Sequence, residues 1–278
     1  MRRGRRNFAV FLLCAGFALA QNEKAISDQL STLRSLDDNA RAGVTKRLAL
    51  EIRKLPKSSK LGLAAELGNL ATEGDFGRDT LQEVTTTLEQ ALGESPIRVN
   101  DAAPDPAYVE LAQLARYENM RVTLDDPQYT AALAKLEADD QDRRKAEFTL
   151  TDIQGKSWTL KDLRGKVVLI NFWATWCPPC RKEMPDLDAL YGRFKAQGLV
   201  ILAVSQEEAD TVKPFIAERQ KVSYPILLDP GGSVSHQFHV DGIPKTFVYD
   251  RAGKLVAQSI DMRTMNQFLE MLGRAGLR

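Results

Sequence analysis

Residues 166–185 have the sequence KVVLINFWATWCPPCRKEMP, and this stretch decides the fold of half the chain. The segment from Lys166 to Ala174 is almost continuously apolar, which is typical of a parallel strand buried on both faces. A helix is predicted from about Pro178 to Lys195, so Cys177 and Cys180 lie where the strand turns into the helix. This arrangement predicts an α/β sheet covered by helices.

The position of Cys177 favours reactivity. A thiol at a helix N-terminus faces unpaired backbone N–H groups and the positive end of the helix dipole, which lower its pKa from about 8.5. Cys177 is therefore the candidate nucleophile, and Cys180, one helical turn later, is the candidate resolving thiol. Pro178 and Pro179 stand where a missing N–H costs a helix little. Because they remove donors, we expect a smaller lowering of the pKa than non-proline residues would allow.

Strands and helices continue on both sides of this motif. Before it, the segments Phe148–Thr151 and Trp158–Leu160 flank a turn and predict a hairpin. The elements predicted after it are a strand over Leu199–Val204, a helix over Ala209–Arg219, a short apolar run over Pro225–Leu228, strands over Thr246–Tyr249 and Leu255–Ser259, and a helix over Thr264–Leu272. We therefore predict one α/β domain over residues 145–278.

Residues 21–144 have a different pattern. Apolar residues recur there every three or four positions, which predicts about six amphipathic helices in a bundle or short solenoid. The apolar stripes include Ile26, Leu48, Leu67 and Leu88, and the last two helices are expected over Tyr108–Asn119 and Pro127–Glu137. We interpret the charged run 139–145 as a solvated linker and place the domain boundary between residues 144 and 145. No residue of this all-α domain carries an evident chemistry, so its role stays open.

The first twenty residues predict an export signal peptide. Four arginines precede an apolar run from Phe8 to Leu19, and Ala18-Leu19-Ala20 matches an A-x-A cleavage site. The apolar run is shorter than the roughly 18 to 20 residues that span a bilayer, so a retained membrane anchor is the less favoured alternative. We therefore expect a periplasmic or secreted protein whose mature form keeps two cysteines, Cys177 and Cys180.

The charge balance excludes one class of function. The chain has 38 basic and 37 acidic residues, a net charge of +1, and loss of the four arginines of the signal peptide would make it negative. Proteins that bind nucleic acids use an excess of positive charge to release counterions. We therefore do not expect a polynucleotide partner.

The run from Asn171 to Pro185 resembles the active site of the exported TlpA and ResA type of thiol–disulfide oxidoreductase, within the thioredoxin-like superfamily. The resemblance extends over Phe148–Leu272. It implies a cis peptide bond before Pro244, and a substrate groove in which Ile243 offers backbone hydrogen bonds to an extended peptide. The residues expected to contact substrate are Trp176, Pro178, Pro179, Ile243 and Pro244.

Proton transfer is expected to involve Glu183. Thioredoxins carry a buried aspartate beneath the disulfide, but this chain has Asn171, which cannot accept a proton. Glu183 follows Cys180 on the same helix by less than one turn, and the resemblance implies that its carboxylate accepts the proton of Cys180. The predicted catalytic residues are therefore Cys177, Cys180 and Glu183.

The predicted function is the exchange of disulfides with protein thiols and disulfides outside the cytoplasm, without an organic cofactor or a metal. The resemblance favours a reductant that receives electrons from a membrane electron donor. A disulfide oxidase or isomerase is the alternative, because about 30 mV already shifts such an equilibrium by about 1.4 kcal/mol. The helical domain is a candidate binding site for a protein partner.

Three other interpretations stay open. A purely structural disulfide would close a loop of only four residues, which constrains the unfolded chain little. A Cu(I) carrier would add His236 and His239 to the two thiols, although copper-carrying relatives of this fold space their cysteines one residue wider. A peroxidase would carry a threonine three residues before its cysteine, where this chain has Ala174.

Overall fold

The computed structural model describes residues 21–98 and 103–278, so the predicted signal peptide lies outside the described residues. The chain divides into two compact units. The first extends to Ala71 and includes Phe76–Leu133, and the second consists of Thr72–Asp75 and Ala134–Arg278. The division falls inside helix α6 (Pro127–Lys145), ahead of the boundary predicted between residues 144 and 145.

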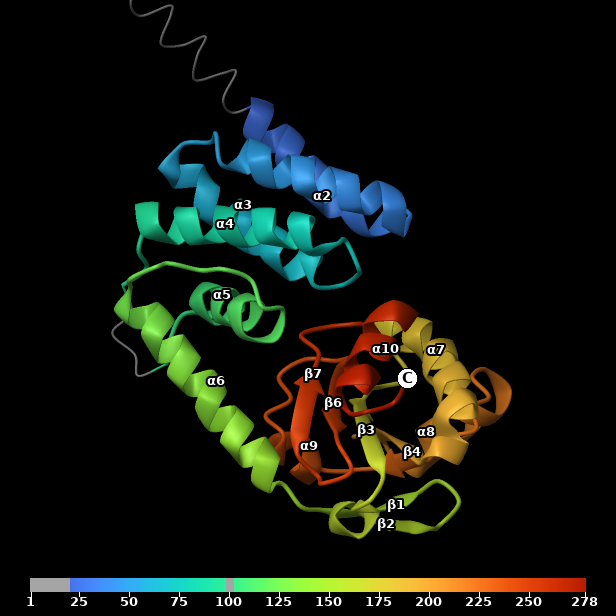
Figure 1. Cartoon of the computed structure of the whole chain (residues 1–278). Helices are drawn as coiled ribbons and strands as arrows, with labels where there is room; N and C mark the ends of the chain where they lie inside the picture. The colour runs from blue at the N-terminus through green and yellow to red at the C-terminus, as the bar shows by residue number, and fades with distance from the viewer. Residues whose placement is uncertain (1–20, 99–102) are drawn as a thin grey trace, which may run out of the picture. The chain divides into compact units, whose positions relative to one another are not determined.

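The first unit is helical, as its periodicity predicts. Its elements are a helix over residues 21–32, the 3-10 turn η1 (Leu33–Ser35), α2 (Asp38–Ile52), α3 (Lys57–Ala71), α4 (Arg78–Glu94), α5 (Pro106–Tyr117) and the start of α6. The predicted stripe residues Ile26, Leu48, Leu67 and Leu88 are all fully buried. Helices α2, α3 and α4 pack on one another, and α5 lies against α3 and α4 (Figure 1). Burial of these stripes stabilises helices that would be marginal alone.

The second unit contains a seven-stranded sheet with the order β2-β1-β5-β4-β3-β6-β7. The strands are β1 (Thr149–Asp152), β2 (Ser157–Thr159), β3 (Val167–Phe172), β4 (Leu199–Ser205), β5 (Ile226–Leu228), β6 (Lys245–Tyr249) and β7 (Leu255–Gln258). Strands β3, β4 and β5 are parallel, whereas β6 runs antiparallel to β3. Strands β1 and β2 form the predicted hairpin. The α/β prediction for this half is therefore confirmed, with β3 between β4 and β6.

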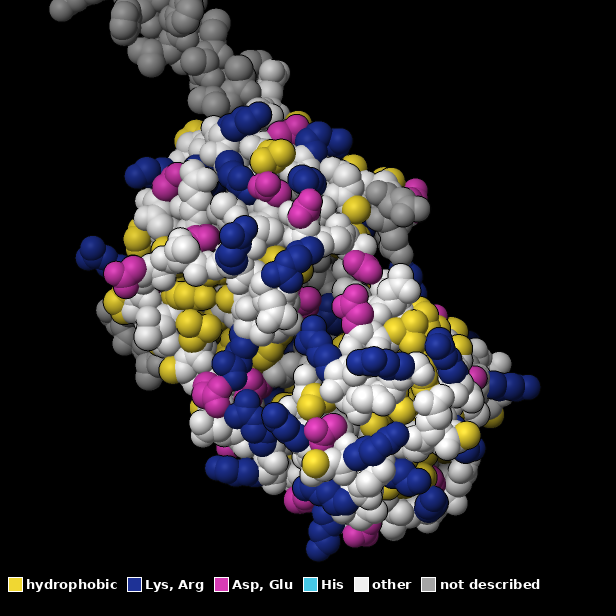
Figure 2. Space-filling view, viewed as in Figure 1, with side chains coloured by type: hydrophobic (Ala, Val, Ile, Leu, Met, Phe, Trp, Pro, Cys, Tyr) yellow, Lys and Arg dark blue, Asp and Glu magenta, His cyan; other side chains and the backbone are white. Residues whose placement is uncertain are grey.

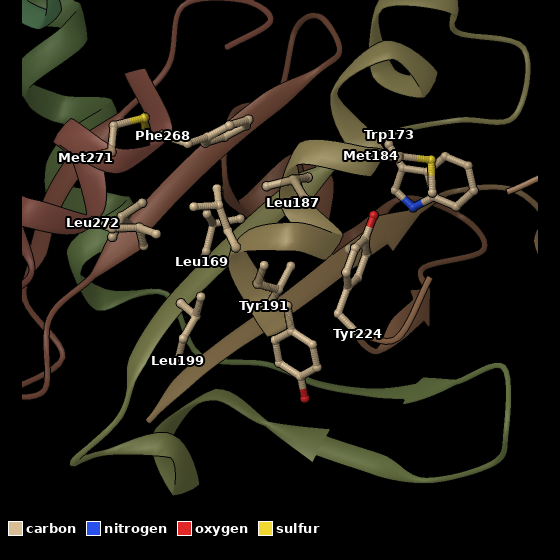
Figure 3. Close-up of a cluster of buried hydrophobic side chains, with 14 of the residues drawn as sticks. Leu169, Trp173, Met184, Leu187, Tyr191, Leu199, Tyr224, Phe268, Met271 and Leu272 are labelled. Carbon is tan, nitrogen blue, oxygen red and sulfur yellow. The ribbon is translucent and has the colours of Figure 1, made fainter. Parts of the chain in front are cut away.

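Helices cover both faces of this sheet. They are α7 (Pro178–Phe194), α8 (Ala209–Glu218), the short α9 (Ser233–Gln237) and α10 (Met265–Arg274), with 3-10 turns η2 (Leu160–Leu163) and η3 (Lys195–Gln197). Because side chains alternate along a strand, Leu169 of β3 joins the core under α7 and α10, whereas Ile170 joins the core on the opposite face. Figure 3 shows Leu187 and Leu272, from α7 and α10, around Leu169. Burial on both faces explains the continuous apolar run.

The C-terminal end of α6 belongs to the second unit. The buried Arg143 guanidinium donates hydrogen bonds to the Phe238 carbonyl at 2.8 Å, to Asp140 Oδ1 at 3.0 Å and to the His239 carbonyl at 3.3 Å. The interpretation of residues 139–145 as a solvated linker is therefore wrong. Asp140 and Arg143 are buried because this face of α6 packs on the second unit, and α6 extends to Lys145 rather than ending near residue 137.

Replacing Arg143 with lysine tests this contact. Lysine keeps the positive charge beside Asp140, but its single nitrogen cannot replace the three separate guanidinium nitrogens that donate to Phe238, Asp140 and His239. We therefore expect the second unit to lose about 2 kcal/mol of unfolding free energy. Arg144→Lys is the matched control, because the Arg144–Glu137 ion pair is 44% and 41% exposed and contributes less than about 1 kcal/mol. Tryptophan fluorescence in urea reports this unit, since it holds all three tryptophans. Equal losses in both variants would contradict the assignment.

The surface carries charges of both signs. Figure 2 shows lysine and arginine side chains spread over the visible face, with acidic side chains among them. In the part of the chain that the structure describes, no helix has both the length and the apolar character needed to cross a membrane.

Candidate active site

The two predicted cysteines form a disulfide at the start of α7. Cys177 and Cys180 are joined with their Cα atoms 5.3 Å apart, and both are buried. Cys177 is the N-cap of α7, and its Sγ accepts a hydrogen bond from the Cys180 backbone N–H at 3.3 Å. The strand-to-helix placement predicted for the pair is therefore present, and a helix N-terminal N–H faces the sulfur that we expect to react.

Pro178 and Pro179 are the first two residues of α7. Neither has an N–H, so neither can donate to the Cys177 sulfur, and the amide of Cys180 is the first in the helix that can. Pro178 is exposed and Pro179 is half-buried. The smaller lowering of the Cys177 thiol pKa expected from the two prolines stays a prediction.

The segment before β6 lies beside the disulfide. The Ile243–Pro244 peptide bond is cis, as the family resemblance implies, and the Ile243 carbonyl oxygen is 3.8 Å from Cys177 Sγ. The register between β3 and β6 explains the proximity, because Phe172 of β3 pairs with Lys245, the residue after Pro244. Two segments more than sixty residues apart in sequence therefore meet at the C-terminal end of β3.

Glu183 lies in the second turn of α7 and is buried, with 1% of the residue exposed. Its Oε1 accepts a hydrogen bond from Asn171 Nδ2 at 2.7 Å, and its Oε2 accepts one from the Arg263 backbone N–H at 3.1 Å. Burial raises the pKa of Glu183 from 4.5 to about 8, because the charged form loses its hydration, and these two hydrogen bonds oppose the rise. In the disulfide form the carboxyl group therefore holds a proton at neutral pH.

The hydrogen-bond partners of Glu183 extend across the sheet. Asn171 Nδ2 also donates to Thr246 Oγ1 at 3.1 Å, and the Thr246 backbone N–H donates to Ser259 Oγ at 2.8 Å. Sequence reasoning identified Asn171 and Glu183 but missed Thr246, Ser259 and the Arg263 amide. No local pattern signals them, since they come from strand β6 and from the segment after β7, more than sixty residues from Asn171 and Glu183.

Sequence reasoning also missed Glu207, whose carboxylate is hydrogen-bonded to Thr175, two residues before Cys177. Its carboxylate accepts hydrogen bonds from the Thr175 backbone N–H at 2.6 Å and from Thr175 Oγ1 at 2.7 Å. Ser205 Oγ donates a third, at 3.2 Å. One signal was available, because Glu207 follows β4, the parallel neighbour of β3, and the carboxyl ends of neighbouring parallel strands meet at one edge of a sheet.

A groove of about 480 Å³ opens beside the disulfide. Its walls bring together the predicted substrate residues Trp176 and Ile243 with Trp173 and two acidic residues, Glu207 and Asp241. Trp176 is 69% exposed, whereas the neighbouring Cys177 is 2% exposed. The groove therefore offers an accessible aromatic surface next to a nearly covered sulfur.

The two histidines do not face the cysteines together. His236 is exposed on α9, and the His239 ring is directed at α6, with Nε2 2.9 Å from Asp142 Oδ2 and Nδ1 3.7 Å from Asp139 Oδ1. Over residues 21–98 and 103–278, no group of three or more His, Cys, Asp or Glu side chains is placed to hold a metal ion. The ligand set considered for Cu(I) is thus not assembled in this conformation.

A disulfide closed at a helix N-terminus, beside a cis-proline on a thioredoxin-like sheet, defines a thiol–disulfide oxidoreductase. Comparison with known proteins gives the same class. Residues 143–258 match the AhpC/TSA family. The chain belongs to the ResA-type family of thiol–disulfide oxidoreductases.

Two relatives illustrate this membership. The thiol-disulfide oxidoreductase ResA of Bacillus cereus is 33% identical over 144 residues, which cover 52% of this chain and 83% of the relative. The protein of the same name from Geobacillus kaustophilus is 41% identical over 109 residues, covering 39% of this chain and 63% of the relative.

Solved structures of related proteins also match. The exposed lipoprotein thioredoxin Etrx1 of Streptococcus pneumoniae is 30% identical with a TM-score of 0.42, and the match covers 46% of this chain and 98% of that one. A thioredoxin-family thiol:disulfide interchange protein of Chlorobium tepidum is 28% identical with a TM-score of 0.43, covering 46% and 92% respectively.

Proposed function

We propose that this protein reduces disulfides of protein partners outside the cytoplasm through its Cys177–Cys180 pair. The observation that carries the proposal is the disulfide at the N-cap of α7, 3.8 Å from the Ile243 carbonyl in the wall of an open groove. The predicted signal peptide supports the location, and the family supports the chemistry.

The reaction consists of two exchanges. In the reduced enzyme, the Cys177 thiolate attacks one sulfur of the substrate disulfide and displaces the other, which leaves as a thiol after taking up a proton. The Cys180 thiolate then attacks Cys177 in the mixed disulfide, which forms the Cys177–Cys180 bond and releases the second substrate thiol. Two electrons pass from the enzyme to the substrate, and the two released substrate thiolates take up their protons from the solvent.

Glu183 accepts the proton that Cys180 must lose before it attacks. The disulfide form is the state that follows this transfer, and burial there raises the pKa of Glu183 to about 8, so that the carboxyl group holds the proton at pH 7. The hydrogen bonds from Asn171 and from the Arg263 amide keep the carboxyl group in place while its charge changes. Asn171 is a positioning residue in this scheme.

The oxidised enzyme must be reduced again before the next turnover. We propose a membrane electron donor for this step, because the predicted location separates the enzyme from cytoplasmic reductants. The helical unit is proposed as a binding site for a protein partner. Its described residues include ion pairs between its own helices, such as that of the buried Lys60 of α3 with the half-buried Glu94 of α4.

The direction of electron flow can be measured directly. Equilibration of the pair with glutathione or dithiothreitol buffers gives its reduction potential, and a reductant requires a value near that of thioredoxin, about −270 mV. A value close to about −120 mV would reverse the proposal and make the protein an oxidase. The Cys177→Ser and Cys180→Ser double variant gives the baseline.

A further inference from the structure

We propose that the groove beside the disulfide selects substrate segments that carry a positive charge next to their cysteine. This inference rests on the proposed function and names the substrate class for that site. It follows from the charges of the groove walls, from the exposed indole of Trp176 and from the position of Asp241 relative to the reacting sulfur.

The walls of the groove carry negative charge only. Among the described residues that line it, Glu207 and Asp241 are acidic and none is lysine or arginine. The groups that donate hydrogen bonds to the Glu207 carboxylate, from Thr175 and Ser205, are uncharged, so none of them is a cation that competes with a bound one. A cation in the groove would therefore meet two carboxylates and no like charge.

Asp241 lies where it can contact the substrate beside the exchanging cysteine. Asp241 is exposed and precedes Ile243 by two residues. The Ile243 carbonyl oxygen is 3.8 Å from Cys177 Sγ. A substrate strand that pairs with the Ile243 backbone places its own cysteine at Cys177 and a neighbouring side chain near residue 241.

Trp176 also attracts positively charged side chains. Its indole is 69% exposed in the groove wall, and the face of an exposed indole attracts lysine and arginine side chains. Arg181 and Lys182, which are exposed on α7, do not line the groove and therefore do not oppose a cation there. The partner that fits is an extended segment with lysine or arginine beside its cysteine.

Symmetric disulfide dimers of three capped peptides, Gly-Xaa-Cys-Xaa-Gly with Xaa as lysine, glutamine or glutamate, test the preference. For each peptide, the second-order rate constant for oxidation of the pre-reduced enzyme is measured and divided by the rate constant at which the dithiothreitol thiolate reduces the same peptide. This division removes differences in the reactivity of the peptide sulfur and the attraction of the peptide for any attacking thiolate. We expect the lysine peptide to be preferred over the glutamate peptide about tenfold at low salt, and about two- to threefold near 0.5 M salt.

Two variants locate the effect. Asp241→Asn and Trp176→Leu, both at exposed side chains, are each expected to lower the lysine-to-glutamate ratio about threefold. Glu270→Gln is the matched control, because it removes the same charge from an exposed position of α10 that does not line the groove, and it should leave the ratio unchanged.

An equal rate for all three peptides, or a ratio that Asp241→Asn does not lower, would overturn the inference while exchange itself stands. Failure to reduce any peptide would overturn the proposed function and the inference with it.

Discussion

The Cys180→Ser variant is expected to accumulate covalent adducts with its substrates, whereas Cys177→Ser is expected to form none. Cys177 is the N-cap residue of α7 and lies beside the groove, so we expect its sulfur, and not that of Cys180, to make the first bond to the substrate. Without Cys180 no internal thiolate resolves the mixed disulfide, and the adduct persists. Turnover should fall at least about 10³-fold in both variants, because each removes one of the two sulfurs that the reaction requires.

Non-reducing electrophoresis of protein isolated after acid quenching and alkylation measures these adducts. The matched control is the double variant Cys177→Ser, Cys180→Ser, which should show the same background as Cys177→Ser. Reduction with dithiothreitol should release the partners, whose identities then name the substrates. Adducts that form through Cys180 in the Cys177→Ser variant, at the level seen for Cys180→Ser, would reverse the assignment of the two cysteines.

The second large effect is a pH dependence of stability that Glu183 imposes on the oxidised protein. The folded form holds the proton up to about pH 8, because burial raises the pKa of Glu183, whereas the unfolded chain releases it near the ordinary value of 4.5. Between these values the unfolded state binds fewer protons, so stability falls as pH rises. Below about pH 4.5 the contribution is fully present, and the loss toward pH 8 is at most about 1.4 kcal/mol per pH unit.

Glu183→Gln removes this dependence, since an amide of nearly the same shape does not titrate. Urea unfolding of the oxidised protein at intervals between pH 5 and about pH 8, followed by tryptophan fluorescence, should show a smaller decline for the variant than for the parent. Glu218→Gln, at an exposed position on α8, is the control and should keep the parent slope. Parallel curves for parent and Glu183→Gln would show that the carboxyl group is ionised in the folded protein.

Local patterns in the sequence were sufficient for most elements of the fold, although α9 was not predicted and α6 was predicted to end too early. The apolar run before Asn171 predicts β3 because a strand buried on both faces needs no alternation, and the stripes that contain Leu48 and Leu88 predict helices because one face of each is buried. The placement of Cys177 and Cys180 at a helix start needs only the boundary between these two patterns. The family resemblance added the cis bond before Pro244, which no periodicity indicates.

Tertiary structure alone decided how these elements meet. The Arg263 amide reaches Glu183 across eighty residues of sequence, and the Glu207 carboxylate reaches Thr175 across thirty-two. The charged end of α6 was predicted to be solvated, because charge normally indicates exposure. Arg143 is nevertheless buried there, and its guanidinium donates a hydrogen bond to the Phe238 carbonyl, ninety-five residues away in sequence. The sequence by itself thus determined most of the helices, the strands and the reactive pair, since these depend on neighbours along the chain. The surroundings of that pair were decided by the packing of the sheet, because hydrogen bonds between distant segments leave no periodic trace in a sequence.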